Sequence, residues 1–230
     1  MALVNYHDTT FSPAGLWNFN NDLTDSSGNG FTLTVGSGVE RYADISPGVR
    51  GLVIDGATYV SKSSFTSTLG ITGDMTIEML LVIGVIPTGS VYVTHVGSTS
   101  GESSADNYLY QFTLLTGSSP RQQMFWETGA GTNITYQIND TVPFSGLCHW
   151  AVTRTSGVVQ FYVNGRASGA ASTSLTSPTD GTGGTFKIGS DATSPATACT
   201  LASVKVVASA LSATNIKSEY LKTLGGLYVS

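Results

Sequence analysis

Short runs rich in Val, Ile, Thr, Tyr and Phe recur along the chain, and clusters of Gly, Ser, Asn and Pro separate them. This pattern is typical of an antiparallel β-sandwich or barrel, because branched and aromatic side chains suit a pleated backbone and the small residues suit turns. The clearest turn is Asn164-Gly165, directly after the apolar run at residues 158–163. Asn-Gly supplies the two positive φ angles of a type I′ hairpin, so we expect residues 166–171 to pair back.

The alternation of these runs and turns predicts a mostly β chain with little helix. The expected strands cover residues 15–19, 31–35, 51–54, 59–61, 75–83, 91–96, 108–115, 122–127, 134–138, 147–153, 158–163, 186–188 and 201–207. Gln160 is the one polar residue in the run at 158–163, which predicts a central strand covered on both faces.

One helix is expected, over residues 213–222. Ser212 is its predicted N-cap, and Gly225-Gly226 is its predicted end. Ile216, Tyr220 and Leu221 share a face at helical spacing, and we expect that face to pack on the sandwich.

Charge is scarce, at 11% of the 230 residues with a net charge of −5. The ten basic residues are scattered, which argues against nucleic-acid binding. No apolar run approaches the roughly 18 residues of a membrane-spanning helix. Residues 1–8 lack the basic and apolar regions of a secretory signal, so we expect synthesis in the cytoplasm. The length suits an N-terminal arm at 1–13 and one domain at 14–230.

Cys148 and Cys199 are the only cysteines, and each lies in an apolar, strand-like stretch. We interpret them as two small buried hydrophobic residues, with a disulfide as the alternative. Two cysteines are too few for a structural zinc cluster.

Seven short motifs follow one another along residues 14–223. They are GLWNFNNDLTDSSGNG at 15–30, DGATYV at 55–60, GDMTIEM at 73–79, HWAVTR at 149–154, FYVNG at 161–165, FKIG at 186–189 and LSATNI at 211–216. Together they resemble the laminin-G-like, concanavalin A-like jelly-roll family. The resemblance implies an all-β, two-sheet antiparallel jelly-roll sandwich with a concave face and one short C-terminal helix. Its members include lectins, adhesion modules, glucanases and virion proteins, so the residues must indicate the function.

A hydrolase is not favoured by the acidic residues. The hydrolytic relatives place acids at alternate positions of one strand, which brings two carboxylates to about 5 Å. No glutamate here has a second acid two residues away, and Glu78 is the one acid on an apolar strand. The structural interpretation of Glu78 is a partly exposed or hydrogen-bonded carboxylate. Cys148 and His149 point to opposite faces of a strand and cannot form a dyad, so we expect no catalytic activity.

The resemblance also implies one Ca²⁺ at the rim of the sandwich. Asp25 would be its side-chain ligand, and loop carbonyls would complete an oxygen shell. The family's second acid is missing from the strand at 201–205, and we expect Asp191 to substitute for it. The alternative is that Asp25 forms an Asx turn in its glycine-rich loop.

Glycan sites in such folds use an aromatic ring for stacking. Tyr108, Tyr110 and Trp126 lie beside predicted loops and are the candidate carbohydrate-binding residues, with core packing as their alternative. Trp17 and Trp150 are expected in the core.

Apolar residues near both ends and the low charge favour contacts between subunits. The leading hypothesis is therefore a non-enzymatic phage virion component, a capsid decoration or tail-associated appendage. It would attach to virion subunits on the virion surface, with a homo-oligomer as a further expectation, and its loops would bind host or environmental glycans. The alternative is a secreted or cell-surface lectin-like module, which would be extracellular. A polysaccharide hydrolase is the third hypothesis.

Overall fold

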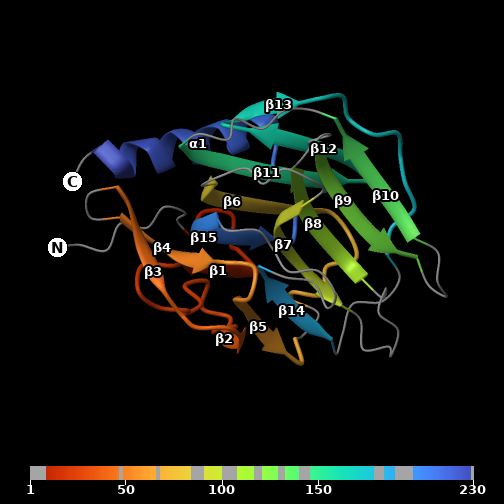
Figure 1. The fold of residues 1–230 in the computed structure, drawn as a ribbon. Helices are drawn as coiled ribbons and strands as arrows, with labels where there is room; N and C mark the ends of the chain where they lie inside the picture. Colours follow the sequence, from red (N-terminus) through yellow and green to blue (C-terminus); the bar gives the residue numbers. More distant parts are fainter. Residues whose placement is uncertain are drawn as a thin grey trace.

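The fold is a sandwich of two antiparallel β-sheets with one helix on the outside (Figure 1). The computed structural model describes residues 9–46, 49–65, 68–83, 91–99, 108–116, 121–128, 133–139, 146–178, 184–189 and 199–228. The predicted all-β jelly-roll architecture is confirmed. No helix in these ranges is long and apolar enough to cross a membrane.

Sheet A has the strand order β13-β12-β11-β6-β15-β4-β3, and β1 also pairs with β15. Its strands are β1 (Gly15–Asn18), β3 (Tyr42–Ser46), β4 (Val49–Ile54), β6 (Met75–Ile83), β11 (Leu147–Thr155), β12 (Val158–Val163), β13 (Arg166–Ser168) and β15 (Cys199–Val207). Sheet B has the order β10-β9-β8-β7-β14-β5-β2. Its strands are β2 (Thr34–Ser37), β5 (Tyr59–Ser63), β7 (Val91–Thr99), β8 (Tyr108–Thr116), β9 (Arg121–Glu127), β10 (Asn133–Ile138) and β14 (Thr185–Ile188).

The main core lies between the two sheets, where alternate side chains from each sheet point inward. Trp150 on β11 meets Phe112 on β8, with ring centroids 3.8 Å apart. Trp17 on β1 stacks on Phe186 of β14 at 5.0 Å. The expected burial of Trp17 and Trp150 is confirmed, since both are fully buried.

The strand expected at 31–35 begins three residues later than predicted. Phe31 and Leu33 are buried, but the backbone of Phe31 is already bonded to the preceding loop and to Trp17. With these groups used, ladder pairing starts only at Thr34, which faces Ser61 of β5. Strand β3 was not predicted, because the sequence of Tyr42–Ser46 has no apolar alternation. In the structure its side chains are at most partly buried, which explains the missing pattern.

The turn at Asn164-Gly165 is confirmed, with φ angles of 49° and 72°, but only residues 166–168 of the expected 166–171 pair back. Its strand β12, however, is not the central strand that was predicted. It lies between β11 and the three-residue edge strand β13, and Gln160 is partly exposed. On its outer face Val158 and Gln160 are only partly buried, and the face is covered mainly at Tyr162, in the cluster with Ile216 of the helix.

Helix α1 (Ala213–Tyr228) crosses the outer face of sheet A (Figure 1). Ser212 caps it as predicted, since Ser212 Oγ accepts a hydrogen bond from the Asn215 amide. The predicted end was wrong, whereas the predicted contact face is confirmed at Ile216 and at Tyr220, whose ring lies 5.9 Å from that of His149, and wrong at Leu221. The helix continues through both glycines, and Leu221 is 53% exposed while Ile216, Glu219 and Thr223 are buried. A buried lysine on the sheet below explains this choice of face, as described below.

The N-terminal segment docks on its own domain from Thr9 onward. The Ala14 amide donates to the Val206 carbonyl of β15 at 2.7 Å, and Phe11 packs beside Val207 and Leu211 under α1. This is the self-docking alternative for residues 9–13; residues 1–8 lie outside the described ranges.

Candidate functional site

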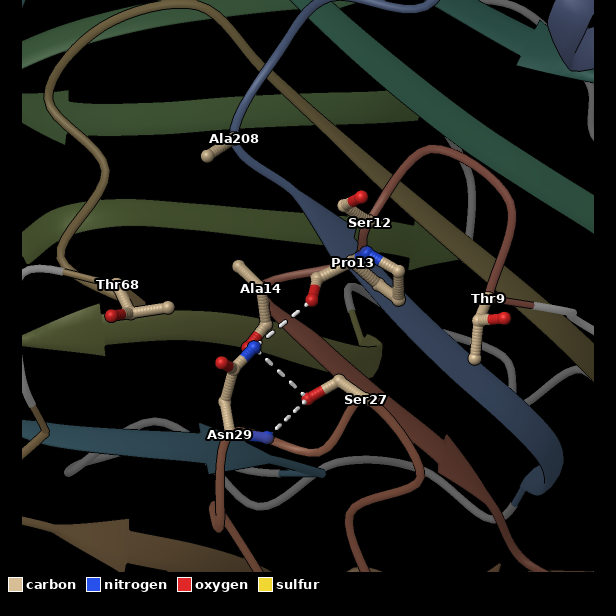
Figure 2. A pocket seen from close by; sticks show the side chains of 8 residues that line it. All are labelled: Thr9, Ser12, Pro13, Ala14, Ser27, Asn29, Thr68 and Ala208. Atoms are coloured by element: carbon tan, nitrogen blue, oxygen red, sulfur yellow. Dashed lines mark hydrogen bonds between the residues drawn. The ribbon is translucent and has the colours of Figure 1, made fainter.

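A polar pocket lies where the N-terminal segment meets the loop after β1 (Figure 2). Its volume is about 570 Å³, which is within the usual range for small-ligand sites. Four separate segments of the chain contribute its lining residues, which are Thr9, Ser12, Pro13, Ala14, Ser27, Asn29, Thr68 and Ala208.

Asn29 joins two walls of the pocket. Its Nδ2 donates to the carbonyls of Pro13 and Ala14, each at 3.1 Å, and to Ser27 Oγ at 3.2 Å (Figure 2). The Asn29 backbone amide also donates to Ser27 Oγ. These bonds occupy the amide nitrogen, whereas Asn29 Oδ1 accepts no hydrogen bond from a described residue and is available to a ligand donor.

The opposite wall is shaped by an unusual backbone. Phe11 and Ser12 have φ angles of 70° and 47°, two consecutive non-glycine residues in the left-handed region. Such conformations cost about 1–2 kcal/mol per residue, so the surrounding contacts must hold them. The turn bond from the Ser12 amide to the Thr9 carbonyl and the docking of Ala14 supply that support and bring Thr9 and Ser12 to the pocket.

Among the residues that the structure describes, the lining is uncharged: five of the eight carry a hydroxyl or an amide, and three are apolar. Hydroxyls and amides can both donate and accept, so they match a neutral ligand that carries hydroxyl groups. An ionic ligand would find no countercharge among these residues. None of the eight described lining residues is aromatic, so their contribution to binding is hydrogen bonds and shape.

Asp25, the predicted calcium ligand, lies in the loop that also carries Ser27 and Asn29. Its carboxylate binds backbone amides. Asp25 Oδ1 accepts from the amides of Leu16 and Ser27 at 3.1 and 2.9 Å, and Oδ2 accepts from the Phe31 amide at 2.9 Å. The bond to Ser27 is the Asx turn of the alternative interpretation.

This donor set does not fit Ca²⁺, because the described neighbours of the carboxylate present N–H groups rather than oxygens. No group of three His, Cys, Asp or Glu side chains in the described ranges could hold a metal. Asp191 lies outside those ranges.

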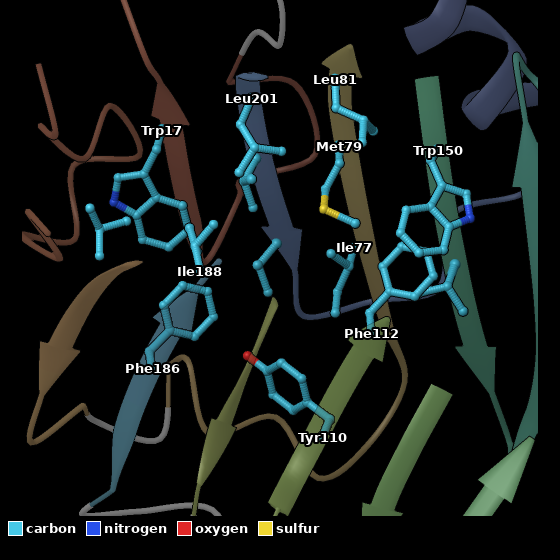
Figure 3. Close-up of a cluster of buried hydrophobic side chains, with 14 of the residues drawn as sticks. Trp17, Ile77, Met79, Leu81, Tyr110, Phe112, Trp150, Phe186, Ile188 and Leu201 are labelled. Atoms are coloured by element: carbon cyan, nitrogen blue, oxygen red, sulfur yellow. The ribbon is translucent and has the colours of Figure 1, made fainter. Parts of the chain in front are cut away.

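The predicted carbohydrate-binding aromatics do not form the pocket. Tyr110 and Trp126 are fully buried, and Figure 3 shows Tyr110 pointing into the core with Phe112. Their polar groups are satisfied inside the protein, since Tyr110 Oη donates to the Leu69 carbonyl and Trp126 Nε1 to the Thr176 carbonyl. Both rings therefore have the packing role of the alternative. Tyr108 is placed in β8, but its side chain lies outside the described part.

Glu78 is neither exposed nor paired with a second catalytic acid. It is fully buried on the outer face of sheet A, opposite Lys205 in the β6–β15 register. Glu78 Oε2 is 3.6 Å from Lys205 Nζ, and Glu78 Oε1 is 3.4 Å from His149 Nε2. The predicted partial exposure was wrong, because α1 covers this face and brings Glu219 within 2.6 Å of Lys205 Nζ.

His149 and Cys148 point to opposite faces of β11, as predicted. Cys148 belongs to the core between the sheets. His149 lies under α1 beside Glu78, which also contacts Lys205. Both cysteines are free and buried, which confirms their interpretation as small hydrophobic residues. Burial raises the pKa of the Cys148 thiol to about 12, so it is no nucleophile at neutral pH.

Sequence reasoning missed most of the pocket. Ser27 and Asn29 belong to the glycine-rich motif from which only Asp25 was selected, so that motif held a usable signal. Thr9, Ser12 and Thr68 carry no local signal, because the fold alone brings their segments together.

Three solved structures show the same fold at low sequence identity. Domain 4 of AbnA, a GH43 extracellular arabinanase from Geobacillus stearothermophilus in complex with arabinotriose, is 18% identical with a TM-score of 0.70. The alignment covers 91% of this chain and 98% of that one.

The binding domain of Botulinum neurotoxin DC is similar in two complexes. With rat synaptotagmin II it is 12% identical, covers 96% of this chain and has a TM-score of 0.65. With SialylT it is 15% identical, covers 92% and has a TM-score of 0.63. The match spans about half of either neurotoxin chain, 52% in each case.

No curated protein sequence matches the chain. A family model does, over residues 55–217, which is well over half of the chain and includes most of the strands of both sheets. The chain belongs to the concanavalin A-like lectin/glucanases superfamily, within its laminin-G-like group.

Proposed function

We propose that this protein is a non-enzymatic, lectin-like binding module that takes neutral, hydroxyl-rich glycans in the pocket formed by Thr9, Ser12, Ser27, Asn29 and Thr68. The observation that carries the proposal is the uncharged lining, in which hydroxyl and amide groups surround a space of about 570 Å³. Because the described lining residues offer no aromatic ring for stacking, affinity should be weak, with a Kd on the order of 1 mM for a single sugar unit.

The absence of catalysis is part of the proposal. Asp25 lies in the loop that also carries Ser27 and Asn29, and its carboxylate accepts hydrogen bonds from three backbone amides. Glu78 and Glu219 are bound to Lys205 on the far side of sheet A. A glycosidase needs a carboxylic acid and a carboxylate flanking one bond, and none of the pocket residues is acidic.

We place the module on a virion surface, as a capsid decoration or tail-associated appendage made in the host cytoplasm. The chain has few charged residues, and folding leaves fewer of them on the surface. Five charged side chains in the described ranges are buried: Asp25, Glu78, Arg154, Lys205 and Glu219. Such a surface loses little solvation energy when it meets neighbouring subunits. The alternative is an extracellular lectin-like module.

Titration calorimetry or ligand-observed NMR tests the glycan site, with arabinotriose and other neutral oligosaccharides as probes. The arabinanase domain binds arabinotriose, and the neurotoxin domain is found with SialylT, so a sialylated glycan is the charged comparison. We expect neutral sugars to bind and the sialylated glycan to bind more weakly, since the pocket offers no countercharge.

Ala208→Trp should fill the pocket and abolish binding, because Ala208 lines it and is exposed. Ala171→Trp is the matched control, an exposed alanine outside the pocket, and should bind as the wild type does. Equal binding by both variants would remove the pocket from the proposal. Reducing-sugar release from polysaccharides would contradict the non-enzymatic part.

Detection of the protein on purified particles tests the virion part. Immunogold labelling or mass spectrometry of particles should find it at a fixed copy number. Recovery only as a free protein, outside the cell that makes it, would favour the secreted module instead.

A further inference from the structure

The outward side of helix α1 carries positive charge beside an exposed leucine. Leu221 is 53% exposed, and Lys217 is exposed one turn before it on the same side of the helix. Arg166, the first residue of β13, is also exposed. It lies next to Lys217, because the Lys217 Cα is 3.1 Å from the position that a Cβ on Gly165 would take. We call Arg166, Lys217 and Leu221 the cationic face.

The charge of the cationic face is not cancelled within the described part of the chain. Neither Arg166 nor Lys217 forms an ion pair with a described residue. Glu219 is the single acid in the sequence of α1, and it is buried against Lys205. The cationic face therefore presents two exposed positive charges on a protein whose net charge is −5.

A surface of opposite charge lies around the start of β3. Val39 is 65% exposed there, and Glu40 and Asp22 are exposed as well. The Tyr42 hydroxyl donates to Glu40 Oε1 at 2.6 Å. Burial raises the pKa of Tyr42, and the charges of Glu40 and Asp22 raise it further, so both carboxylates lie near the same phenol. We call Asp22, Val39 and Glu40 the acidic corner.

The two arginines near the acidic corner have other partners. Arg41 is ion-paired with Asp55, and Arg50 is ion-paired with Asp44 at 3.1 Å. Because each arginine is matched by an aspartate outside the acidic corner, the two carboxylates of the corner remain as excess negative charge.

The cationic face and the acidic corner are complementary in composition. Each has two exposed charges of one sign and one exposed aliphatic side chain, and the two signs are opposite. Val39 and Leu221 are the two most exposed large hydrophobic side chains of the described residues. An apolar centre with charges at its rim is the usual composition of a contact between proteins.

The two surfaces lie at opposite ends of sheet A. In the strand order of the described residues, β13 ends the sheet on one side and β3 ends it on the other. In Figure 1, α1 and β13 lie at the top of the molecule, and β2 and β3 lie toward its lower left. This placement favours a head-to-tail contact, in which each copy uses one surface toward each neighbour.

We propose that copies of this chain associate head-to-tail, with the cationic face of one copy on the acidic corner of the next. The two cations face the two carboxylates, and Leu221 packs on Val39. A second copy is favoured as the occupant because the chain itself carries the complementary charges and the complementary apolar side chain. A contact of this heterologous type generates a closed ring or a filament.

This association goes beyond the proposed glycan binding and does not depend on it. The described residues that line the pocket include no member of the cationic face or the acidic corner. Glycan titration and self-association can therefore succeed or fail separately.

Reversing the charges of one surface at a time tests the contact. The face variant, Arg166→Glu/Lys217→Glu, is acidic on both surfaces, and the corner variant, Asp22→Lys/Glu40→Lys, is basic on both. Neither should associate with itself. An equimolar mixture of the two should associate, because each variant carries the surfaces that the other needs. The chain with all four substitutions is the matched control, since it has the net charge of the wild type and should associate as the wild type does.

Sedimentation velocity over a range of protein concentrations, at low salt, measures the association. We expect concentration-dependent oligomers for the wild type, for the four-substitution chain and for the mixture. Association of each variant alone should be weaker by about 30-fold, because two attractive charge pairs become repulsive. Added NaCl should weaken the wild-type association, since exposed charges are screened. Circular dichroism and thermal melts should show all the variants folded.

Three results would overturn the proposal. The first is a monomeric wild type at every concentration. The second is a mixture of the two variants that fails to associate. The third is loss of association in the face variant alone with an unaffected corner variant, which would indicate that the cationic face binds a different anionic surface.

Discussion

Lys205 is ion-paired with two glutamates beneath helix α1, and its removal should destabilise the protein strongly. Lys205 Nζ is 2.6 Å from Glu219 Oε2 and 3.6 Å from Glu78 Oε2, and all three side chains are at most 1% exposed. The other nearby ammonium, Lys222, is 3.0 Å from Glu219 Oε1 but 44% exposed. Lys205→Met keeps most of the side-chain volume while it removes the buried positive charge.

The two distances set the scale of the effect. At an effective dielectric constant of about 20, the attractions to Glu219 and Glu78 are roughly 6 and 5 kcal/mol. The cost of burying the lysine offsets much of this, so the net loss is smaller than the sum. Removing one partner of a buried ion pair costs about 3–5 kcal/mol, because the remaining charges stay buried without compensation. We expect a loss of that size for Lys205→Met.

Urea unfolding followed by tryptophan fluorescence measures the free energy of unfolding, with the m-value as a check on two-state behaviour. Lys205→Met combined with Glu78→Gln and Glu219→Gln should recover most of the lost stability, because the uncompensated charges are gone. A loss below about 1 kcal/mol for Lys205→Met, or no recovery in the triple variant, would refute this account of the cluster.

Three further predictions concern the loop, the thiols and the hairpin. Asp25→Ala should lower the free energy of unfolding by about 3 kcal/mol, because three backbone amides lose their acceptor. EDTA should leave the wild-type melting temperature unchanged, and a drop with EDTA would indicate a bound cation. Ellman's reagent at pH 8 should leave the folded protein unmodified, since both thiols are buried and burial raises the pKa of Cys148 to about 12. In urea without reductant, the reagent should titrate two thiols. Finding no thiol in urea would indicate a disulfide. Gly165→Ala should cost about 2 kcal/mol in a thermal or urea melt, because φ is 72° and the new Cβ would lie 2.9 Å from Tyr220 Cδ1; an unchanged stability would contradict the close packing of the hairpin on α1.

The elements that were predicted well are those whose pattern is local. Strands Met75–Ile83 and Val158–Val163 have the boundaries expected from their apolar runs, and the Asn164-Gly165 turn has the expected backbone. The contact face of α1 was predicted correctly at Ile216 and Tyr220 and wrongly at Leu221. Helical periodicity selected Leu221, but the buried Lys205 of β15 pairs with Glu219 and turns that side of the helix inward.

Amino-acid order alone determined the strand and turn pattern, the membership of a jelly-roll family and the lack of spaced catalytic acids, because these depend on residues that are close along the chain. Tertiary structure alone decided that Tyr110 and Trp126 face the core, that Asp25 binds backbone amides, and that Thr9, Asn29 and Thr68 share a pocket. The reason is that burial and shared sites depend on which distant segments the two sheets bring together. The type of a side chain does not determine which distant residues will pack over it.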